Sequence, residues 1–196
     1  MALLTDSDIR RHCTHSELWF AGRPLISPFS EPVAAGVSYG LTSVGYDIRL
    51  DNRVMVFNST RYEPIDPKLF KDEEYKRQLF DTYDAEKSIV LPGHSYALVQ
   101  SLEYFSLPAR IKGRCVGKST YARCGVIVNT TPLEPEWHGR LTIEVSNSSP
   151  RAVKLWVGEG IAQLEFELLE HRPERTYADK CGKYQGQTDV TPARTL

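Results

Sequence analysis

The stretch RLTIEVS, residues 140–146, decides the fold class because hydrophobic and polar side chains alternate along it. Successive side chains of a β-strand point to opposite faces of a sheet, so this alternation predicts a half-buried strand. Its hydrophobic face would carry Leu141, Ile143 and Val145, and its polar face Thr142, Glu144 and Ser146. On the pattern alone, Glu144 is interpreted as an ordinary solvated carboxylate.

Similar short runs lie on both sides of this stretch. They occupy residues 46–50, 53–57, 88–91, 96–100, 125–129, 152–157 and 161–169. Turn signals such as Leu-Pro-Gly at 91–93 and Gly-Glu-Gly at 158–160 separate them, without long amphipathic helices between. The 196 residues therefore predict one mainly β domain, a sandwich or barrel that spans residues 1–196.

Only short helices are expected. Thr5 and Ser7 are candidate N-caps for a helix that includes Ile9 and His12. Residues 66–84 carry many charges with scattered aromatics, and fit either a short helix or a surface loop. Residues 22–38 are rich in Pro, Gly and Ser and predict an irregular segment. After Arg172 the hydrophobic periodicity is lost, which by itself predicts a flexible terminus.

Composition narrows the choice of partners and compartment. A net charge of −1 argues against a general nucleic-acid or membrane-surface binder, although a few Lys and Arg suffice for a triphosphate. No hydrophobic run approaches the roughly 20 residues of a membrane span, and the N-terminus turns polar too early for a signal peptide. The widely spaced cysteines predict reduced thiols in a cytosol, bacterial or of a virus-infected host cell. They are Cys13, Cys115, Cys124 and Cys181.

A basic, glycine-containing segment, GKSTYARCG at residues 117–125, is a candidate anion site. With the preceding residues it gives G-x-x-x-G-K-S, one residue short of the P-loop pattern. A P-loop runs from a buried strand into a helix, whereas residues 125–129 have the pattern of another strand. A generic anion site and a basic surface turn both remain open on spacing alone.

The sequence predicts no zinc site. His12, Cys13 and His15 lie close together, but no companion pair of ligands follows with zinc-binding spacing. The H-x-E and P-C-x-x-C motifs of the zinc-dependent nucleobase deaminases are absent from the sequence. We therefore expect no metal ligands from protein side chains.

Several long strings together resemble the bacterial dCTP deaminases, which belong to the trimeric dUTPase-like superfamily. The strings are YGLTSVGYDIRL (39–50), LEYF (102–105), GKSTYARCGVIVNTTPLEPEWHG (117–139), LTIEVSN (141–147), EGIAQLEF (159–166) and GKYQGQ (182–187). They run in register over nearly the whole chain. The resemblance implies a distorted β-barrel or jelly-roll with short helices, assembled as a homotrimer with active sites between neighbouring subunits.

The resemblance also implies a reaction, the hydrolytic, zinc-independent deamination of the cytosine of dCTP to dUTP and ammonia. Mg²⁺ would accompany the triphosphate. Glu144 matches the catalytic glutamate of the family, and Ser119 and Arg123 match residues that hold the reacting water and orient that glutamate. An arginine beside Glu144 would favour its ionised form.

Substrate-binding residues follow from the same resemblance. Two backbone positions would help to aim the water, two side chains would contact phosphates, and residues 172–196 would form a substrate-closing tail. These residues are Thr131 and Pro132 for the water, Lys118 and Thr120 for the phosphates, and Tyr177, Lys183 and Gln187 in the tail. The glycine-rich string at 39–50 is given a structural role only.

One departure from the family pattern concerns substrate preference. The chain reads EPEWHG where relatives usually read EPEWEG, so His138 replaces an acidic residue. This exchange is either neutral or alters the site or the trimer contact. Glu136 and His138 are therefore the candidate specificity residues, and a preference for a C5-substituted dCTP remains open.

Three other functions were weighed. A dUTPase would need an aspartate within the turn TPLEPEWHG at residues 131–139, which has none. A bifunctional deaminase that continues to dUMP is poorly separated by sequence. A non-catalytic nucleotide sensor is disfavoured because Glu144 and Ser119 are both present.

Overall fold

The computed structural model describes residues 2–58 and 64–195, and it confirms a mainly β fold. The strands within these ranges are β1 (Ala2–Leu3), β2 (Ile26–Ser27), β3 (Gly40–Thr42), β4 (Gly45–Phe57), β5 (Phe80–Asp84), β6 (Ser88–Leu91), β7 (Tyr96–Ser106), β8 (Ile111–Gly117), β9 (Val126–Asn129), β10 (His138–Asn147), β11 (Val153–Trp156) and β12 (Gly160–Leu168). The helices are α1 (Asp6–Thr14), α2 (Glu73–Leu79), α3 (Ser119–Ala122) and the 3₁₀ turns η1 (Ser16–Leu18) and η2 (Pro67–Lys71).

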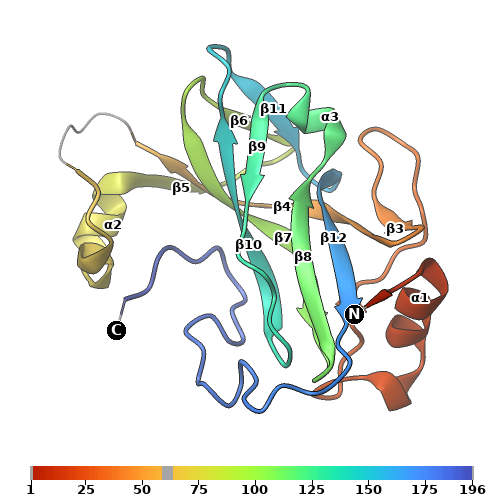
Figure 1. Cartoon of the computed structure of the whole chain (residues 1–196). Coiled ribbons are helices and arrows are strands. Elements are labelled where there is room, and N and C mark those ends of the chain that lie inside the picture. Colours follow the sequence, from red (N-terminus) through yellow and green to blue (C-terminus); the bar gives the residue numbers. More distant parts are fainter. Residues whose placement is uncertain (1, 59–63, 196) are drawn as a thin grey trace.

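Most strands belong to one curled antiparallel sheet (Figure 1). Its main path is β1-β12-β4-β7-β10-β9, while β6 and β11 form a separate pair. The first half of β4 pairs with β12 and its second half with β5 and β7, with a register shift between Leu50 and Val54. Irregularities of this kind bend strands and increase twist. The long strand therefore passes from one side of the curl to the other.

The concave side of the sheet encloses the main hydrophobic core. Ile143 and Val145 of β10 are fully buried there with Val99 of β7, as the alternation predicts. A smaller hydrophobic cluster lies on the opposite face of the same strands. It is formed by Met55, Phe70, Leu79, Phe80, Leu98 and Val190. We call these two sides the inner face and the outer face.

The helices and the segment 66–84 match the predictions from the sequence only in part. Thr5 caps α1 as predicted, since its hydroxyl accepts from the Asp8 N–H and the Asp8 carboxylate accepts from the Thr5 N–H. Residues 66–84 were expected to be a helix or a loop, and instead form η2, α2 and β5 in succession. None of the helices in the described ranges has the length and hydrophobicity needed to span a bilayer.

The strings at 39–50 and 102–105 meet in a buried ion pair. The Arg49 Nε donates to the Glu103 carboxylate at 2.6 Å, and the side chain of Glu103 is fully buried. Gly40 has a φ of +94°, and a Cβ there would lie 2.4 Å from the Glu31 carbonyl oxygen. These contacts agree with the structural role given to the first string.

The tail, residues 172–195, has no helix or strand but packs against the sheet. Figure 1 shows it running back beneath the sheet towards α2. The backbone of Gln187 forms a parallel bridge with Gly139, and the Arg140 N–H donates to the Gln187 carbonyl at 2.8 Å. The flexible terminus predicted from the residue pattern is thus a packed segment in this structure.

Candidate active site

Glu144 lies on the outer face of β10, between a hydrophobic and a polar neighbour. In the strand register it is opposite Leu98 of β7 on one side and Asn129 of β9 on the other. Directly opposed residues of antiparallel strands have side chains close enough to interact. The alternation of β10 therefore turns Glu144 away from the inner core and places it beside Leu98.

A cavity of about 320 Å³ covers Glu144. Its walls come from β7, β10, the loop at residues 131–137, the segment 66–84 and the tail. The lining residues are Phe70, Phe80, Tyr96, Leu98, Thr131, Pro132, Leu133, Glu134, Trp137, Leu141, Thr142, Glu144, Tyr177, Tyr184, Gln187, Thr191 and Ala193. This volume is within the range of small-molecule sites, which are mostly apolar with a few placed polar groups.

Few hydrogen bonds offset the burial of the Glu144 carboxylate. Burial raises the pKa of Glu144 above its ordinary value. Its Oε2 atom is buried and, among the residues that the structure describes, has no hydrogen-bond partner. A buried polar atom without a partner is costly, and such groups concentrate at functional sites. The solvated carboxylate inferred from alternation alone is therefore wrong: Glu144 is half-buried and carries a free acceptor oxygen.

The α3 residues lie outside this cavity. Ser119, Thr120 and Arg123 are exposed, and they are not among its lining side chains. Within one chain, the pKa of Glu144 is raised by burial and not lowered by Arg123. The chain thus separates the residues that the family resemblance places together.

Lys118 precedes α3 and is engaged by an acidic residue. Its ammonium group forms an ion pair with the Asp47 carboxylate of β4, and the two side chains are only 10% and 12% exposed. Its stem packs beside Gly160, where an added Cβ would lie 3.2 Å from Lys118 Cε. In this arrangement Lys118 could contact a phosphate only by sharing or leaving Asp47.

The loop at 131–137 brings two predicted residues to the cavity. Thr131 and Pro132 line it, on the side of Glu144 away from Leu98. The loop is held by Leu133, whose backbone exchanges hydrogen bonds with Gly113 at 2.9 Å each. Thr131 and Pro132 thus belong to a loop that is anchored to β8 and lines the same cavity as Glu144.

Glu136 and His138 do not line the cavity and instead contact its surroundings. The Glu136 carboxylate accepts from the Thr176 hydroxyl at 2.7 Å and pairs with Arg172. The His138 Nδ1 lies 2.5 Å from the Tyr104 hydroxyl oxygen. Burial, and secondarily nearby Arg23, lowers the pKa of His138.

Two of the three predicted tail residues reach the cavity. Tyr177 and Gln187 line it, and the Gln187 side-chain amide donates to the Arg140 carbonyl at 2.7 Å. Lys183 is exposed, and its ammonium group donates to the Arg194 carbonyl at 3.2 Å.

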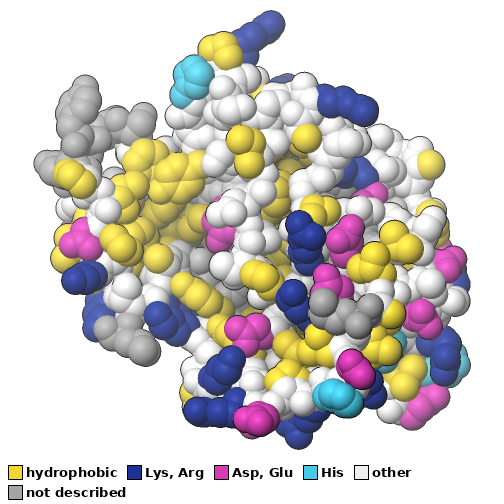
Figure 2. All heavy atoms as spheres, in the orientation of Figure 1, with side chains coloured by type: hydrophobic (Ala, Val, Ile, Leu, Met, Phe, Trp, Pro, Cys, Tyr) yellow, Lys and Arg dark blue, Asp and Glu magenta, His cyan; other side chains and the backbone are white. Residues whose placement is uncertain are grey.

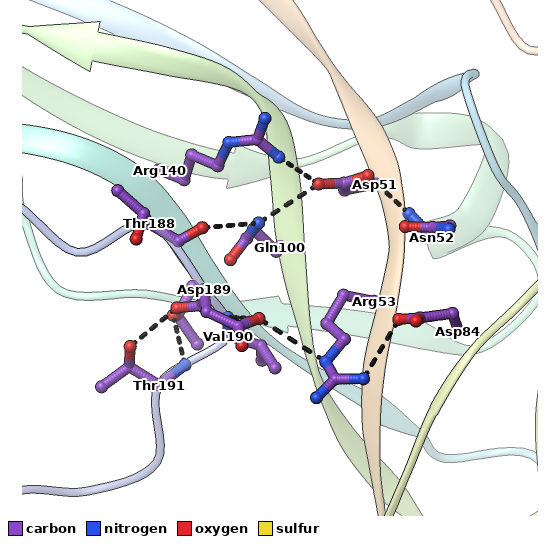
Figure 3. A network of polar contacts seen from close by, with 11 residues as sticks. Asp51, Asn52, Arg53, Asp84, Gln100, Arg140, Thr188, Asp189, Val190 and Thr191 are labelled. Carbon is purple, nitrogen blue, oxygen red and sulfur yellow. Dashed lines mark hydrogen bonds and ion pairs between the residues drawn. The ribbon is translucent and has the colours of Figure 1, made fainter.

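A polar network that sequence reasoning missed fastens the tail to the outer face (Figure 3). Arg140 pairs with Asp51, and the Gln100 amide donates to Asp51 and to the Thr188 carbonyl. Figure 3 also shows Arg53 between Asp84 and Asp189, with nitrogen–oxygen distances of 3.2 and 3.6 Å. The sequence carried one signal for this network. Residues two positions apart on a strand share a face, so Gln100 and Leu98 lie on the same face of β7.

The hydrophobic lining was also missed. Leu98, Tyr96 and Phe80 were interpreted only as strand or loop residues, because nothing local indicates that they face a site. In residues 2–58 and 64–195, no group of three His, Cys, Asp or Glu side chains is arranged to hold a metal ion.

Comparison with known proteins identifies the family. The sequence model of the dCTP deaminase-like family matches residues 3–169. A dCTP deaminase of Nautilia profundicola is 44% identical over 183 residues, covering 90% of this chain and 95% of the relative. A dCTP deaminase of Campylobacter jejuni is 41% identical over the full length of both chains.

A solved structure agrees in fold. The 2'-deoxycytidine 5'-triphosphate deaminase of Agrobacterium tumefaciens superposes with a TM-score of 0.59 at 18% identity, covering 85% of this chain. This chain spans about half (48%) of that longer one. From the family match and the full-length relatives, the chain belongs to the dCTP deaminase-like family.

Proposed function

We propose that this chain is a dCTP deaminase, a hydrolase that converts dCTP and water to dUTP and ammonia without zinc. The observation that carries the proposal is the half-buried Glu144, which lines a cavity in the size range of small-molecule sites and whose Oε2 atom has no hydrogen-bond partner among the described residues. Relatives that are 41% to 44% identical over nearly the whole chain are named for this activity.

Glu144 would serve as the proton carrier. The water oxygen bonds to C4 of cytosine, and the proton that it loses passes through the carboxylate to ring N3. A second proton then moves from the new hydroxyl to the amino nitrogen, the C4–N4 bond breaks, ammonia leaves and a C4 carbonyl forms. A carboxyl group whose pKa is raised by burial exchanges protons more readily near neutral pH, which suits both transfers.

The reacting water would be held by the loop beside Glu144 and by Ser119. Carbonyl oxygens near Thr131 and Pro132 accept a hydrogen bond from water and increase the negative charge on its oxygen. Ser119 and Arg123 are exposed and do not line the cavity beside Glu144 of their own chain. We therefore propose that a neighbouring subunit supplies them, in a homotrimer with shared sites.

Exposed hydrophobic side chains near α3 support such an interface. Ile127 on β9 is 56% exposed and Trp156 on β11 is 41% exposed. The Trp156 N–H donates to the hydroxyl of Tyr121, an α3 residue, at 2.9 Å. Large exposed hydrophobic groups around a polar site are typical of protein–protein contacts.

The triphosphate would lie along α3 of that neighbour. Thr120 would contact phosphate oxygens there, and Lys118 would join it by sharing its bond with Asp47. Mg²⁺ enters as part of the triphosphate substrate and offsets its charge. Such a substrate places the reaction in the cytosol of a bacterium or of a virus-infected host cell.

The tail, extended to residue 196, would close over the bound nucleotide. Tyr177 and Gln187 already line the cavity, and Lys183 would turn from the Arg194 carbonyl to a phosphate. Closure of a segment over substrate excludes water other than the reacting one.

The test is to incubate the purified chain with dCTP, Mg²⁺ and a zinc chelator and to separate the products. Formation of dUTP supports the proposal, whereas dUMP with pyrophosphate would identify the bifunctional alternative. Absence of turnover at a chain concentration that supports the trimer would contradict both. Size-exclusion chromatography with light scattering measures the assembly in the same sample.

A further inference from the structure

The tail contributes part of the wall of the cavity over Glu144. Beside α2 the cavity is bordered by hydrophobic side chains, which Figure 2 shows gathered over that region. From the tail, the lining includes two aromatic residues with hydroxyl groups, Tyr177 and Tyr184. The tail has neither helix nor strand. Individual contacts must therefore hold these two tyrosines in place.

The two tyrosines belong to one closed loop, residues 176–185, which we call the tyrosine loop. The Tyr184 N–H donates to the Tyr177 hydroxyl at 3.0 Å. Gly182 packs directly on the Tyr177 ring, because a Cβ at this position would lie 2.1 Å from the ring atom Cε1. The Gly182 N–H also donates to the Tyr177 carbonyl at 3.1 Å. The tyrosine loop is thus fixed internally, and its position depends on what attaches it to the sheet.

Glu136 attaches the tyrosine loop at both of its ends. At the beginning of the loop, the Thr176 hydroxyl donates to the Glu136 Oε2 atom at 2.7 Å. At the end of the loop, the Gln185 side-chain amide donates to the Glu136 carbonyl at 2.8 Å. The Glu136 side chain is 14% exposed and Thr176 is 1% exposed. Hydrogen bonds to a charged group are stronger than neutral ones, so this shielded contact is a firm attachment.

The backbone of Glu136 adopts a conformation that costs energy. Its φ is +63°, in the left-handed region that residues with a Cβ rarely occupy. Such a conformation persists where the surroundings stabilise it, and it concentrates at functional sites. The Glu136 N–H donates to the Leu107 carbonyl at 3.1 Å, while the Glu136 carbonyl accepts from Gln185. Contacts on both sides of the residue therefore fix its backbone.

The neighbours of Glu136 support the same attachment. The Trp137 indole N–H donates to the Tyr184 carbonyl at 2.9 Å. The Tyr177 N–H donates to the Pro135 carbonyl at 3.1 Å. The two tyrosines are therefore bound directly to the residues on either side of Glu136.

A second acidic residue of the same segment makes a weaker contact with the tyrosine loop. The Lys180 ammonium group donates to the Glu134 carboxylate at 3.2 Å, and the two side chains are 50% and 44% exposed. Exposed pairs of this kind contribute little, because water and salt screen them. The difference in burial makes Glu136 the stronger of the two acidic attachments.

We propose that Glu136 is a positioning residue of the nucleotide site, whose carboxylate keeps the tyrosine loop docked before the substrate arrives. The inference rests on the proposed deaminase function. Glu136 acts through the loop, since its own side chain does not line the cavity. If the loop is docked for only a fraction of the time, the apparent affinity for the nucleotide falls by that fraction. Saturating nucleotide docks the loop again, so kcat is preserved.

Steady-state deamination of dCTP with Mg²⁺ separates these two effects. In Glu136→Ala, KM for dCTP should rise about fivefold to tenfold, whereas kcat should stay within about twofold of wild type. Alanine keeps a Cβ at the same positive φ, so the backbone cost is unchanged and only the carboxylate is lost. An unchanged KM, or a fall in kcat without a rise in KM, would overturn the inference.

A conservative variant should rescue binding. Glu136→Gln keeps an acceptor for the Thr176 hydroxyl and loses only the ion pair with Arg172, whose side chain is 56% exposed. Its KM should therefore stay within about twofold of wild type. Lys180→Ala is the matched control, because it removes the exposed pair with Glu134, and it should also keep KM within about twofold. A KM for Glu136→Gln as high as that of Glu136→Ala would contradict the role of the acceptor oxygen.

Thr176→Val tests the contact from the other side, so that the result does not depend on the folding of Glu136→Ala alone. Valine keeps the shape of threonine and lacks the hydroxyl, and it should raise KM for dCTP by a similar factor. The double variant with Glu136→Ala should bind dCTP no more weakly than the weaker single variant, because both changes remove one contact. Additive losses would show that the two residues act separately.

Trypsin digestion without nucleotide reports docking independently of activity. The tyrosine loop contains two cleavage sites, Lys180 and Lys183. Cleavage there should be faster in Glu136→Ala than in wild type, and equal rates would contradict the inference while leaving the proposed function intact. If the wild-type chain does not deaminate dCTP, the proposed function fails, and the cleavage rates still decide whether Glu136 docks the loop.

Discussion

The inner and outer faces of the β4-β7-β10 region are built from the same strands but are closed in different ways. The inner face is sealed by other strands of the curled sheet and is filled by residues such as Ile143 and Val99. The outer face is covered by the segment 66–84 and by the tail, which leave a cavity over Glu144. The comparison shows that the same strands carry both faces, and that the cavity exists only where the segment 66–84 and the tail form the cover.

Loss of the Glu144 carboxylate, which lines the outer cavity, should have the largest effect on activity. Glu144→Gln is expected to lower kcat for dCTP by about 10²- to 10⁴-fold, because proton transfer through this group is lost. Folding should be unharmed, since the variant removes a poorly compensated buried charge. Ser146→Ala, on the same strand and exposed, is the control and should keep wild-type kcat. Product formation and melting temperature are the measurements. Near-normal turnover would remove Glu144 from the mechanism.

Truncation on the inner face should cost stability instead. Ile143→Ala is expected to lower the free energy of unfolding by about 2–5 kcal/mol, since the fully buried side chain leaves a void. Leu98→Ala should cost less, because Leu98 already borders an open cavity. Urea denaturation of both variants measures the difference. Equal losses would mean that the two faces are closed equally well.

The raised pKa of Glu144 predicts an opposite pH dependence for stability and activity. The folded chain binds the proton of Glu144 more tightly than the unfolded chain does. The free energy of unfolding therefore falls as pH rises from the pKa of this group in the unfolded chain to its higher pKa in the folded chain. Wild type should therefore lose stability relative to Glu144→Gln across that window, while kcat rises as the base form appears. Melting curves from pH 4 to 8 measure the gap between the two proteins. A wild-type melting temperature that does not fall relative to that of Glu144→Gln as pH rises would contradict the assignment.

Substitutions that weaken the attachment of the tail should have the smallest effects. The effect should be larger for the more buried of the two side chains. Gln187→Ala removes a buried side chain that bonds to Arg140, and should raise KM for dCTP and speed proteolysis of the tail. Asp189→Ala removes an exposed ion pair with Arg53, worth about 0.2–1 kcal/mol before screening by salt, and a local hydrogen bond from the Val190 N–H. Limited proteolysis and KM values rank the two variants. A larger effect from Asp189→Ala would reverse this ranking.

The inner face was predictable from sequence because burial there follows strand periodicity. The alternation at 140–146 correctly placed Leu141, Ile143 and Val145 among the buried side chains, although Thr142 is buried as well. Thr5, one of two candidate caps with Ser7, is the cap of α1. The outer face was not predictable in this way. Its cover comes from residues 66–84 and the tail, which have no common period, so the half-burial of Glu144 has no local signal.

The predicted site residues also differ in what the sequence could and could not show about them. The family resemblance predicts a site with Glu144, Ser119 and Arg123, but residue patterns carry no information about which of them would share a subunit. The pairing of Lys118 with Asp47 was also beyond sequence reasoning, since the two residues lie 71 positions apart, Asp47 on β4 and Lys118 between β8 and α3. Long-range contacts of this kind follow from topology and not from local propensity.

The cavity is covered by the segment 66–84 and the tail, whereas the strands β4, β7 and β10 form the scaffold. This separation affects how such a protein can change during evolution. Phe70 and Ala193 border the cavity but belong to segments that contribute no buried residue to the inner core. Loops tolerate insertion and exchange better than the strands that they connect. New substrate preferences could therefore arise by changes in these two segments, while Glu144 and the strands that carry it stay the same.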